Sequence, residues 1–389
     1  MHRARLPLIV STAAFTAAAV IATSVDVATA RPDTAAGTVI DLEFVGQAIL
    51  PTGTMFEGTE VGGLSSVSFD ARRGVYEVIA DDQGNRPTGD PVRTYTMKLD
   101  LSGATFDASD VQFVDVTELL DVGGAAYPPG GLDPEGLTLN GEGGLFVSSE
   151  GIATASPPID PFIRRYNRTG RVTAELPIPG KFLPDGVSRG VRLNLGFESL
   201  NPTPNGRWLV TAAEGALVQD VPPSTATSGS RARILLFDIA RRQPGPEYVY
   251  DVAPWAEPSS IFGVNGIAEV LPLDDAGTML VMERSFSVGG VLGGGTGNVI
   301  VINEVSTAGA TDVSGLDSLA GAPGIVPVIQ REVFAFDDLG IPIDNIEGMT
   351  FGPVLPDGRQ SIVIVSDNNF APTQFTQIIV LAAEIASAD

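Results

Sequence analysis

The chain has 389 residues, a net charge of −24, one histidine and no cysteine. A surface this acidic repels nucleic acid and anionic membranes, so neither is expected as a partner. The composition also excludes zinc sites built from histidine and cysteine. It excludes disulfides as well, so packing and hydrogen bonding must stabilise the fold.

The first thirty residues are predicted to be a secretory signal peptide. A basic start over residues 2–5 precedes an apolar run over residues 6–22, and Ala28-Thr29-Ala30 offers a cleavage site. An N-terminal membrane anchor is the alternative, but the run is rich in alanine and short for a span. We therefore expect residues 31–389 to form the mature protein, secreted or held in the cell envelope. Cleavage would remove the only histidine.

Composition indicates an all-β fold. The chain holds 45 glycines and 29 prolines, which interrupt short runs of Val, Ile, Leu and Phe. Four consecutive units each offer four strands, and hairpin turns such as Pro-Asn-Gly-Arg (204–207) separate the first two strands of each unit. The predicted strands lie at 64–69, 75–80, 94–99 and 111–116; at 136–139, 144–148, 162–166 and 172–178; at 198–201, 207–212, 233–238 and 248–252; and at 267–271, 278–282, 298–303 and 326–334.

A fifth unit has only three strands, at 348–351, 361–365 and 377–382. The segment 39–50 (VIDLEFVGQAIL) near the other terminus can supply the fourth. Placing it there closes a ring and leaves no free sheet edge. We therefore predict one β-propeller domain over residues 31–389, with five four-stranded blades. Six blades are the alternative, if long loops of the second or fourth unit conceal strands.

An acidic motif recurs at the start of each unit, at a spacing longer than the common propeller repeats of about 40–50 residues. The motifs are Gly62-Gly63-Leu64-Ser65-Ser66, a degenerate first member, then Asp133-Pro134-Glu135-Gly136-Leu137, Gly196-Phe197-Glu198-Ser199-Leu200, Gly266-Ile267-Ala268-Glu269-Val270 and Asn345-Ile346-Glu347-Gly348-Met349. A second polar or acidic position follows the next strand each time, at Asp81-Asp82, Glu150, Glu214, Glu283 and Asp367.

The two acidic positions of each unit should lie side by side, because a hairpin brings these strand ends together. We expect the pairs Glu135–Glu150, Glu198–Glu214, Glu269–Glu283 and Glu347–Asp367 around one mouth of the central channel. Carboxylates this close raise each other's pKa unless a cation lies between them. Oxygen ligands without imidazole or thiolate favour a hard cation such as calcium. The alternative is that some of these glutamates only accept hydrogen bonds from backbone amides between blades.

Arg284 follows Glu283 directly and is the best-placed cation for an anionic group of a substrate, through a bidentate contact. A salt bridge to a neighbouring glutamate is the alternative.

The chain resembles a family of secreted phytase-like proteins described as having esterase-like activity of phytase. The resemblance spans about residues 40–385 and rests on these motifs and on the segments that follow them: GTEVGGLSSVSFD (58–70), VSSEG (147–151), AAEG (212–215), MERSF (282–286) and VSDNNF (365–370). It implies a β-propeller with phosphoesterase or esterase activity. In the related propeller phytases, calcium ions at the channel mouth bind phosphate together with lysines and arginines.

Carried over to this sequence, the resemblance implies calcium (Ca²⁺) as the cofactor. The candidate ligands are Glu135, Glu150, Glu198, Glu214, Glu269, Glu283, Glu347 and Asp367. The chain departs from the pattern in having only two lysines, Lys98 and Lys181, which weakens the phosphate-binding half. It also lacks the RHGxRxP signature of histidine acid phosphatases.

The leading hypothesis is therefore a secreted, calcium-dependent hydrolase of phosphate or other esters, with Glu347 as general base and Arg284 as the second catalytic residue. One alternative is a lactonase or carboxylic esterase on a metal propeller. Another is a non-enzymatic cell-envelope binding module with structural calcium. The expected partner is a small-molecule ester, and the protein is expected to be a monomer.

Overall fold

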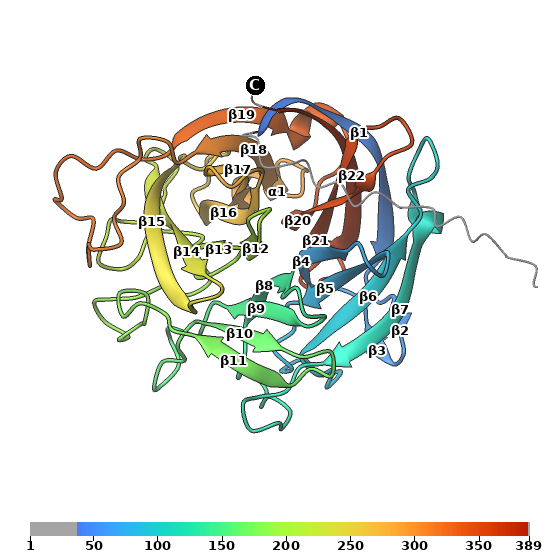
Figure 1. The fold of residues 1–389 in the computed structure, drawn as a ribbon, viewed down its shortest axis with the longest axis horizontal. Helices are drawn as coiled ribbons and strands as arrows, with labels where there is room; N and C mark the ends of the chain where they lie inside the picture. The colour runs from blue at the N-terminus through green and yellow to red at the C-terminus, as the bar shows by residue number, and fades with distance from the viewer. Residues whose placement is uncertain (1–36, 388–389) are drawn as a thin grey trace, which may run out of the picture. The chain divides into compact units, whose positions relative to one another are not determined.

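The computed structural model describes residues 37–387. Figure 1 shows five four-stranded sheets arranged around a central axis. Within the described residues, helix is confined to α1 (Val288–Leu292) and two 3-10 turns, η1 (Ala108–Asp110) and η2 (Phe336–Leu339). The predicted all-β propeller with five blades is confirmed. The predicted signal peptide over residues 1–30 lies outside the described residues.

Each blade is an antiparallel sheet whose first strand lies nearest the axis (Figure 1). Blade 1 contains β4 (Leu64–Asp70), β5 (Val75–Ala80), β6 (Arg93–Leu99) and β7 (Val111–Glu118), and blade 2 contains β8 (Pro134–Leu139), β9 (Leu145–Ser149), β10 (Phe162–Tyr166) and β11 (Val172–Leu176). Blade 3 contains β12 (Asn201–Pro202), β13 (Trp208–Ala212), β14 (Ser230–Asp238) and β15 (Gln243–Val252), and blade 4 contains β16 (Gly263–Pro272), β17 (Thr278–Ser287), β18 (Asn298–Ser306) and β19 (Ile329–Ala335).

Blade 5 is built from both ends of the described chain. It contains β20 (Asn345–Val354), β21 (Gln360–Asp367), β22 (Phe375–Ser387) and, outermost, β1 (Gly37–Pro51). β1 pairs antiparallel with β22 along its whole length, from Gly37 opposite Ser387 to Pro51 opposite Phe375. The segment predicted to close the ring is therefore the closing strand, and it covers the edge that β22 would otherwise expose.

Apolar side chains fill every junction between neighbouring blades. Five separate core clusters lie between blades 1 and 2, 2 and 3, 3 and 4, 4 and 5, and 5 and 1. At the closing junction, Val67 and Val78 of blade 1 pack in one cluster with Val363 and Ile378 of blade 5, and all four are fully buried. Burial of both faces of each sheet explains why the inner strands are almost continuously apolar.

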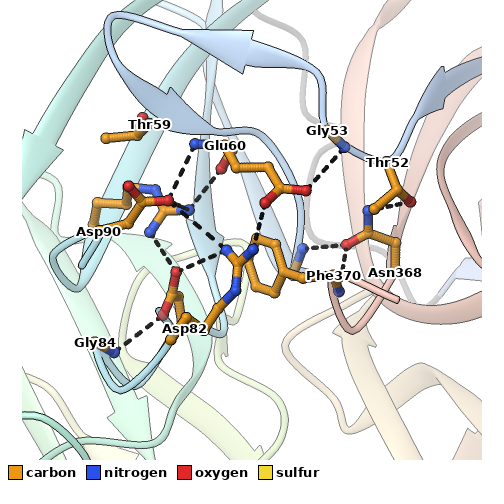
Figure 2. Close-up of polar contacts among 12 residues, drawn as sticks. Thr52, Gly53, Thr59, Glu60, Asp82, Gly84, Asp90, Asn368 and Phe370 are labelled. Carbon is orange, nitrogen blue, oxygen red and sulfur yellow. Dashed lines mark hydrogen bonds and ion pairs between the residues drawn. The ribbon is translucent and has the colours of Figure 1, made fainter. Parts of the chain in front are cut away.

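A charged network reinforces the junction between blades 5 and 1 (Figure 2). Arg93 is fully buried; it donates to Asp82 Oδ2 at 2.8 Å and to the backbone carbonyl of Glu60 at 2.6 Å. Arg86 pairs with the Glu60 carboxylate, and its guanidinium carbon lies 3.5 Å from the centroid of the Phe370 ring. Phe370 belongs to the loop after β21, so this cation–π contact ties blade 5 to blade 1.

Asn368 makes the same connection through hydrogen bonds. Its Oδ1 accepts from the backbone amide of Gly63 at 3.0 Å, and its Nδ2 donates to Thr52 Oγ1 at 3.0 Å (Figure 2). The two short strands β2 (Met55–Phe56) and β3 (Thr59–Glu60) form a hairpin beside this network. Hydrogen bonds of Asn368 and the contact of Arg86 with Phe370 therefore join blades 5 and 1 at the end of the blades where the acidic motifs lie.

Innermost strands approach one another closely, and Gly348 shows how closely. A Cβ on Gly348 would lie 2.7 Å from the Cα of Ser66 on the neighbouring strand β4. We expect Gly348→Ala to force β20 and β4 apart and to lower the free energy of unfolding by about 1–3 kcal/mol, as overpacking typically does. Denaturant unfolding would measure this loss.

Gly315→Ala is the matched control, because nothing lies within 4 Å of its added Cβ. Equal stability of the Gly348 and Gly315 variants would show that the close approach of β20 and β4 is not required.

Candidate functional site

The acidic motif of each blade coincides with an irregularity in the pairing of its first two strands. In four blades the pairing register shifts by one residue within the motif: between Leu64 and Ser66 in blade 1, Pro134 and Leu137 in blade 2, Ile267 and Glu269 in blade 4, and Ile346 and Gly348 in blade 5. In blade 3 the same shift falls between the bridge Phe197–Ala213 and the pair Asn201–Val210. Such a bulge leaves a residue outside the ladder and re-aims its side chain. Counted from the last regular pair, the residues at this bulge position are Ser65, Glu135, Glu198, Ala268 and Glu347.

Blade 4 therefore departs from the other blades, because Ala268 holds its bulge position and Glu269 follows one residue later. Glu269 is fully buried and accepts hydrogen bonds from Asn201 Nδ2 at 3.2 Å, from its neighbour Val270 N at 2.8 Å and from Met349 N at 3.5 Å. Burial raises its pKa to about 8, against the opposing effect of these bonds. Glu269 thus links blades 3, 4 and 5 through hydrogen bonds. This is the alternative role considered above, in which some of the glutamates accept hydrogen bonds between blades.

The second acidic position shows the same offset in blade 4. On the second strand of each blade, we take the residue that directly follows the partner in the last regular pair before the bulge. In blades 1 to 5 these residues are Asp81, Glu150, Glu214, Arg284 and Asp367. Arg284, and not Glu283, is thus the equivalent of the four acids. Glu283 instead accepts from Tyr250 Oη at 2.7 Å, Ala253 N at 3.0 Å and Asn265 Nδ2 at 2.6 Å.

Two groups of three carboxylates form where neighbouring blades meet. Oxygens of Asp81, Asp133 and Glu135 lie within 4.8 Å of one another, as do oxygens of Glu150, Glu198 and Glu214. We call them the blade 1–2 group and the blade 2–3 group. Neither group includes Glu269 or Glu283. Either group could hold a metal ion through its carboxylate oxygens.

The groups differ from the pairs expected from the sequence. Glu198 and Glu214 do share a group, whereas Glu135 and Glu150 fall into different groups. Asp81 and Asp133 complete the blade 1–2 group although neither was among the predicted ligands. The sequence did indicate both positions, because Asp133 is the first residue of its acidic motif and Asp81 occupies the second acidic position of blade 1.

Close packing across the blade junction positions the blade 2–3 group. Gly196 donates its backbone N–H to Glu150 Oε1 at 2.6 Å, and a Cβ on Gly196 would lie 2.8 Å from the Cα of Glu150. Gly266 makes similar room for Glu214, since a Cβ there would lie 2.5 Å from Glu214 Cγ. Glycine at the start of these two motifs therefore leaves room for the acidic residue of the preceding blade.

Burial and mutual repulsion make these carboxylates costly to ionise. Burial, followed by the charges of neighbouring carboxylates, raises the pKa of Glu135 and Glu198 well above the usual range. The same two causes raise the pKa of the partly buried Asp81, whose Oδ1 has no hydrogen-bonding partner among the described residues. Burial raises the pKa of Glu150 to about 8. Without a cation, some of these groups keep a proton at neutral pH.

The remaining predicted ligands, Glu347 and Asp367, lie in blade 5 beside Arg284. Burial and the charge of Glu347 raise the pKa of Asp367 well above its usual range. Glu347 accepts from Arg284 Nη1 and, at 2.8 Å, from Asn345 Nδ2. Asn345 Nδ2 contacts both Glu347 and Asp367, so the two lie near each other, but neither belongs to the two groups of three.

Arg284 bridges blades 3 and 5. Its Nη2 donates to Glu214 Oε1 at 3.0 Å, while Nη1 donates to Glu347 and to Asn345 Oδ1. Its Nε is buried without a partner among the described residues. These carboxylates raise its pKa despite burial, so the guanidinium stays charged. The salt bridge considered as the alternative role of Arg284 is present in the structure.

A pocket of about 1560 Å³ opens beside this corner over blades 3, 4 and 5. Glu214, Arg284 and Asn345 are among its polar lining residues. Trp255 and Phe286 belong to its apolar wall, and a glycine-rich segment over residues 289–297 borders it. A ligand in this pocket would contact both the blade 2–3 group, through Glu214, and the guanidinium.

Residues 59–370, more than half of the chain, match the model of a phytase-like family described as "Esterase-like activity of phytase". The chain belongs to this family. The resemblance read from the motifs is thereby confirmed. No curated protein sequence matches this phytase-like chain.

Solved structures similar to this phytase-like protein are remote. A Lactobacillus plantarum protein is 12% identical, with 83% of this chain and 77% of that chain covered and a TM-score of 0.34. The Pseudomonas aeruginosa periplasmic gluconolactonase PpgL is 14% identical, with 85% and 90% covered and a TM-score of 0.34. A thermostable family-43 glycoside hydrolase is 10% identical, with 87% and 97% covered and a TM-score of 0.45. Similarity this low transfers no activity.

Among residues 37–387, no helix has the length and hydropathy needed to cross a membrane.

The raised pKa values predict an unusual pH dependence of stability in metal-free protein. A carboxyl whose pKa is higher in the folded than in the unfolded state binds more protons when folded, so its stabilising effect is lost as pH rises through the folded pKa. We expect the Tm in chelator to fall between pH 5.5 and pH 8.5, a range that spans the Glu150 pKa of about 8. Millimolar calcium should abolish most of this fall, because the ion replaces the protons. A Tm in chelator that does not fall over this range would contradict the prediction.

If the blade 2–3 group holds a metal ion, removing one of its carboxylates should weaken metal binding. We expect Glu198→Gln to lower the calcium affinity by about tenfold or more, as changes near metal ligands commonly do. Titration calorimetry would measure the affinity. Glu142→Gln is the matched control, since Glu142 is an exposed residue on the β8–β9 hairpin. Equal affinities of the two variants would exclude Glu198 as a ligand.

Proposed function

We propose that this phytase-like protein is a metal-dependent hydrolase of phosphate or other esters that uses calcium at the mouth of the propeller channel. The observation that carries the proposal is the excess of buried carboxylates over cations. Two groups of three carboxylates lie at neighbouring blade junctions, and Arg284 pairs with only one of their members, Glu214. Folding such a cluster is costly unless protons or cations neutralise it, and divalent cations are the natural counter-charge for oxygen ligands.

The two groups fit calcium in their chemistry. Each offers three carboxylates, and Asp81 Oδ1 is buried with no hydrogen-bonding partner among residues 37–387. We propose Asp81, Asp133 and Glu135 as ligands of one ion and Glu150, Glu198 and Glu214 as ligands of another. When bound, such ions supply polarisation of the ester and neutralisation of its oxygens. Glu269 and Glu283 would then be structural residues, because hydrogen bonds between blades already occupy them.

Glu347 and Arg284 are proposed as the catalytic pair. The described chain contains no histidine, and we propose that a carboxylate acts as general base toward water. Glu347 accepts hydrogen bonds from Arg284 and Asn345, which both line the pocket. Arg284 would hold Glu347 in place and present positive charge to an oxygen of the ester.

A structural role for the ions is the second candidate. Each group joins residues of two neighbouring blades, so a bound ion would also tie the blades together. In this case the protein would be a cell-envelope binding module. For either role we expect a monomer, because β1 covers the edge of β22 that would otherwise be free to pair with another chain.

We expect the purified protein to hydrolyse 4-nitrophenyl esters of phosphate or of carboxylic acids, to lose this activity in chelator and to regain it with calcium. Glu347→Gln should lower kcat by about 10²–10⁴-fold, the usual contribution of a general base, with little change in Tm. Glu142→Gln is again the control. Equal rates in chelator and in calcium would overturn metal dependence. A Tm that rises with calcium in protein that hydrolyses none of these esters would favour the structural role of the ions.

A further inference from the structure

The pocket beside Arg284 is large for a phosphate group alone. Its volume is about 1560 Å³, whereas ligand pockets usually measure about 300–1,000 Å³. Glu214, Arg284 and Asn345 line one part of it, and its other lining residues come from blades 3, 4 and 5 and their loops. A molecule that fills it must therefore have a sizeable part beyond the reacting group.

Charge argues against a multiply phosphorylated molecule. Four acids line the pocket, at Glu214, Glu257, Asp337 and Asp344, against one base, Arg284. Arg284 is already paired with two carboxylates. Of the two lysines, Lys181 is buried against Glu247 and donates to the carbonyl of Ser314 at 2.6 Å, so it cannot reach a ligand here. Each further negative charge on a ligand would meet a repulsive wall.

Apolar side chains form much of the remaining wall, and several of them are exposed. Phe262, Leu193 and Val291 line the pocket and are 54%, 47% and 42% exposed. Phe262 also contacts Phe286, with ring centroids 6.3 Å apart. Covering exposed apolar groups with an apolar ligand is favourable because it removes them from water.

Two glycines leave space for the aromatic rings of this wall. A Cβ on Gly263 would lie 2.4 Å from the Trp255 ring, and a Cβ on Gly297 would lie 2.9 Å from the Phe286 ring. The Trp255 ring is fixed by a hydrogen bond of 3.0 Å from its Nε1 to the carbonyl of Ser224. The wall is therefore a formed surface with rings held in place.

We propose that this pocket binds the apolar acyl group of a carboxylic ester, with the ester carbonyl beside Arg284 and Glu214. This inference rests on the proposed ester hydrolysis and names its substrate class. In the reaction, the oxygen of a water molecule forms a bond to the carbonyl carbon and the acyl C–O bond breaks. One water proton passes to the general base and then to the leaving alcohol, so the products are a carboxylic acid, which ionises, and an alcohol.

Binding can be tested without turnover, through the fluorescence of Trp255. The chain has two tryptophans, and the other, Trp208, lies at the start of β13 in a different surface hollow. In a Trp208→Phe background, we expect octanamide, an unreactive analogue of an octanoyl ester, to change the fluorescence of Trp255 saturably. Phe262→Ala should weaken this binding about tenfold, which corresponds to the burial of part of one aromatic side chain.

Ile329→Ala is the control for loss of an exposed apolar side chain, because Ile329 is 63% exposed on β19 and does not line the pocket. It should leave octanamide binding unchanged. Because Phe262 is more than half exposed, its replacement should also leave the Tm unchanged. Failure of octanamide to bind, or equal binding in the Phe262→Ala and Ile329→Ala variants, would overturn the inference. Saturable binding of inositol hexakisphosphate in preference to octanamide would overturn it as well.

Turnover separates this inference from the proposed function. With 4-nitrophenyl octanoate and 4-nitrophenyl acetate as substrates, Phe262→Ala should lower the ratio of their kcat/KM values about tenfold. An unchanged ratio would overturn the acyl pocket while leaving ester hydrolysis intact. Octanamide binding that depends on Phe262, together with no hydrolysis of any ester, would support the pocket and overturn the hydrolase.

Discussion

The close approach of five innermost strands around one axis is the constraint on which this structure depends. Small residues occupy the place next to the bulge in four blades, at Ser66, Gly136, Ser199 and Gly348. A side chain at Gly136 or Gly348 would collide with the neighbouring blade, since a Cβ would lie 2.8 Å or 2.7 Å from its atoms. Only blade 4 places a large residue there, and its Glu269 fills the space between three blades with hydrogen bonds.

The same constraint concentrates charge. Because the bulge turns one residue per blade out of the ladder and the next strand ends beside it, carboxylates from different blades meet within a few ångströms. Burial raises the free-energy cost of ionising each carboxyl group, and the neighbouring carboxylates raise that cost further. Arg284 relieves only the corner between blades 3 and 5. The blade 1–2 and blade 2–3 groups keep an excess of negative charge, and this excess supports a role for metal ions.

Much of the fold could be predicted from the sequence. Hairpin turns and apolar runs located most strands within a few residues, and the incomplete fifth unit indicated the closing strand β1. The site was harder, because side-chain direction in a strand alternates with every residue, so an offset of one changes the face. The motif GIAEV places its glutamate one residue later than DPEGL or GFESL, and MERSF places an arginine where the other blades have an acid. Glu269 and Glu283 were therefore predicted as metal ligands together with the other carboxylates, although neither belongs to the two groups of three. The pocket could not be predicted, because its wall comes from loops that only the closed ring brings together.

Pairing of β1 with β22 also has a consequence for the timing of folding. These strands begin at Gly37 and end at Ser387, so the outermost ladder of blade 5 joins the first and last parts of the described chain. Ladders between segments so distant in sequence form late, because a large loop must close before any contact is gained. Until β22 and β1 are both available, blade 5 is incomplete and its packing against blade 1 cannot form. Blades 1 to 3, which hold both groups of three carboxylates, can form before blade 5, whereas the ion pair between Arg284 and Glu347 forms only once β20 has joined the ring.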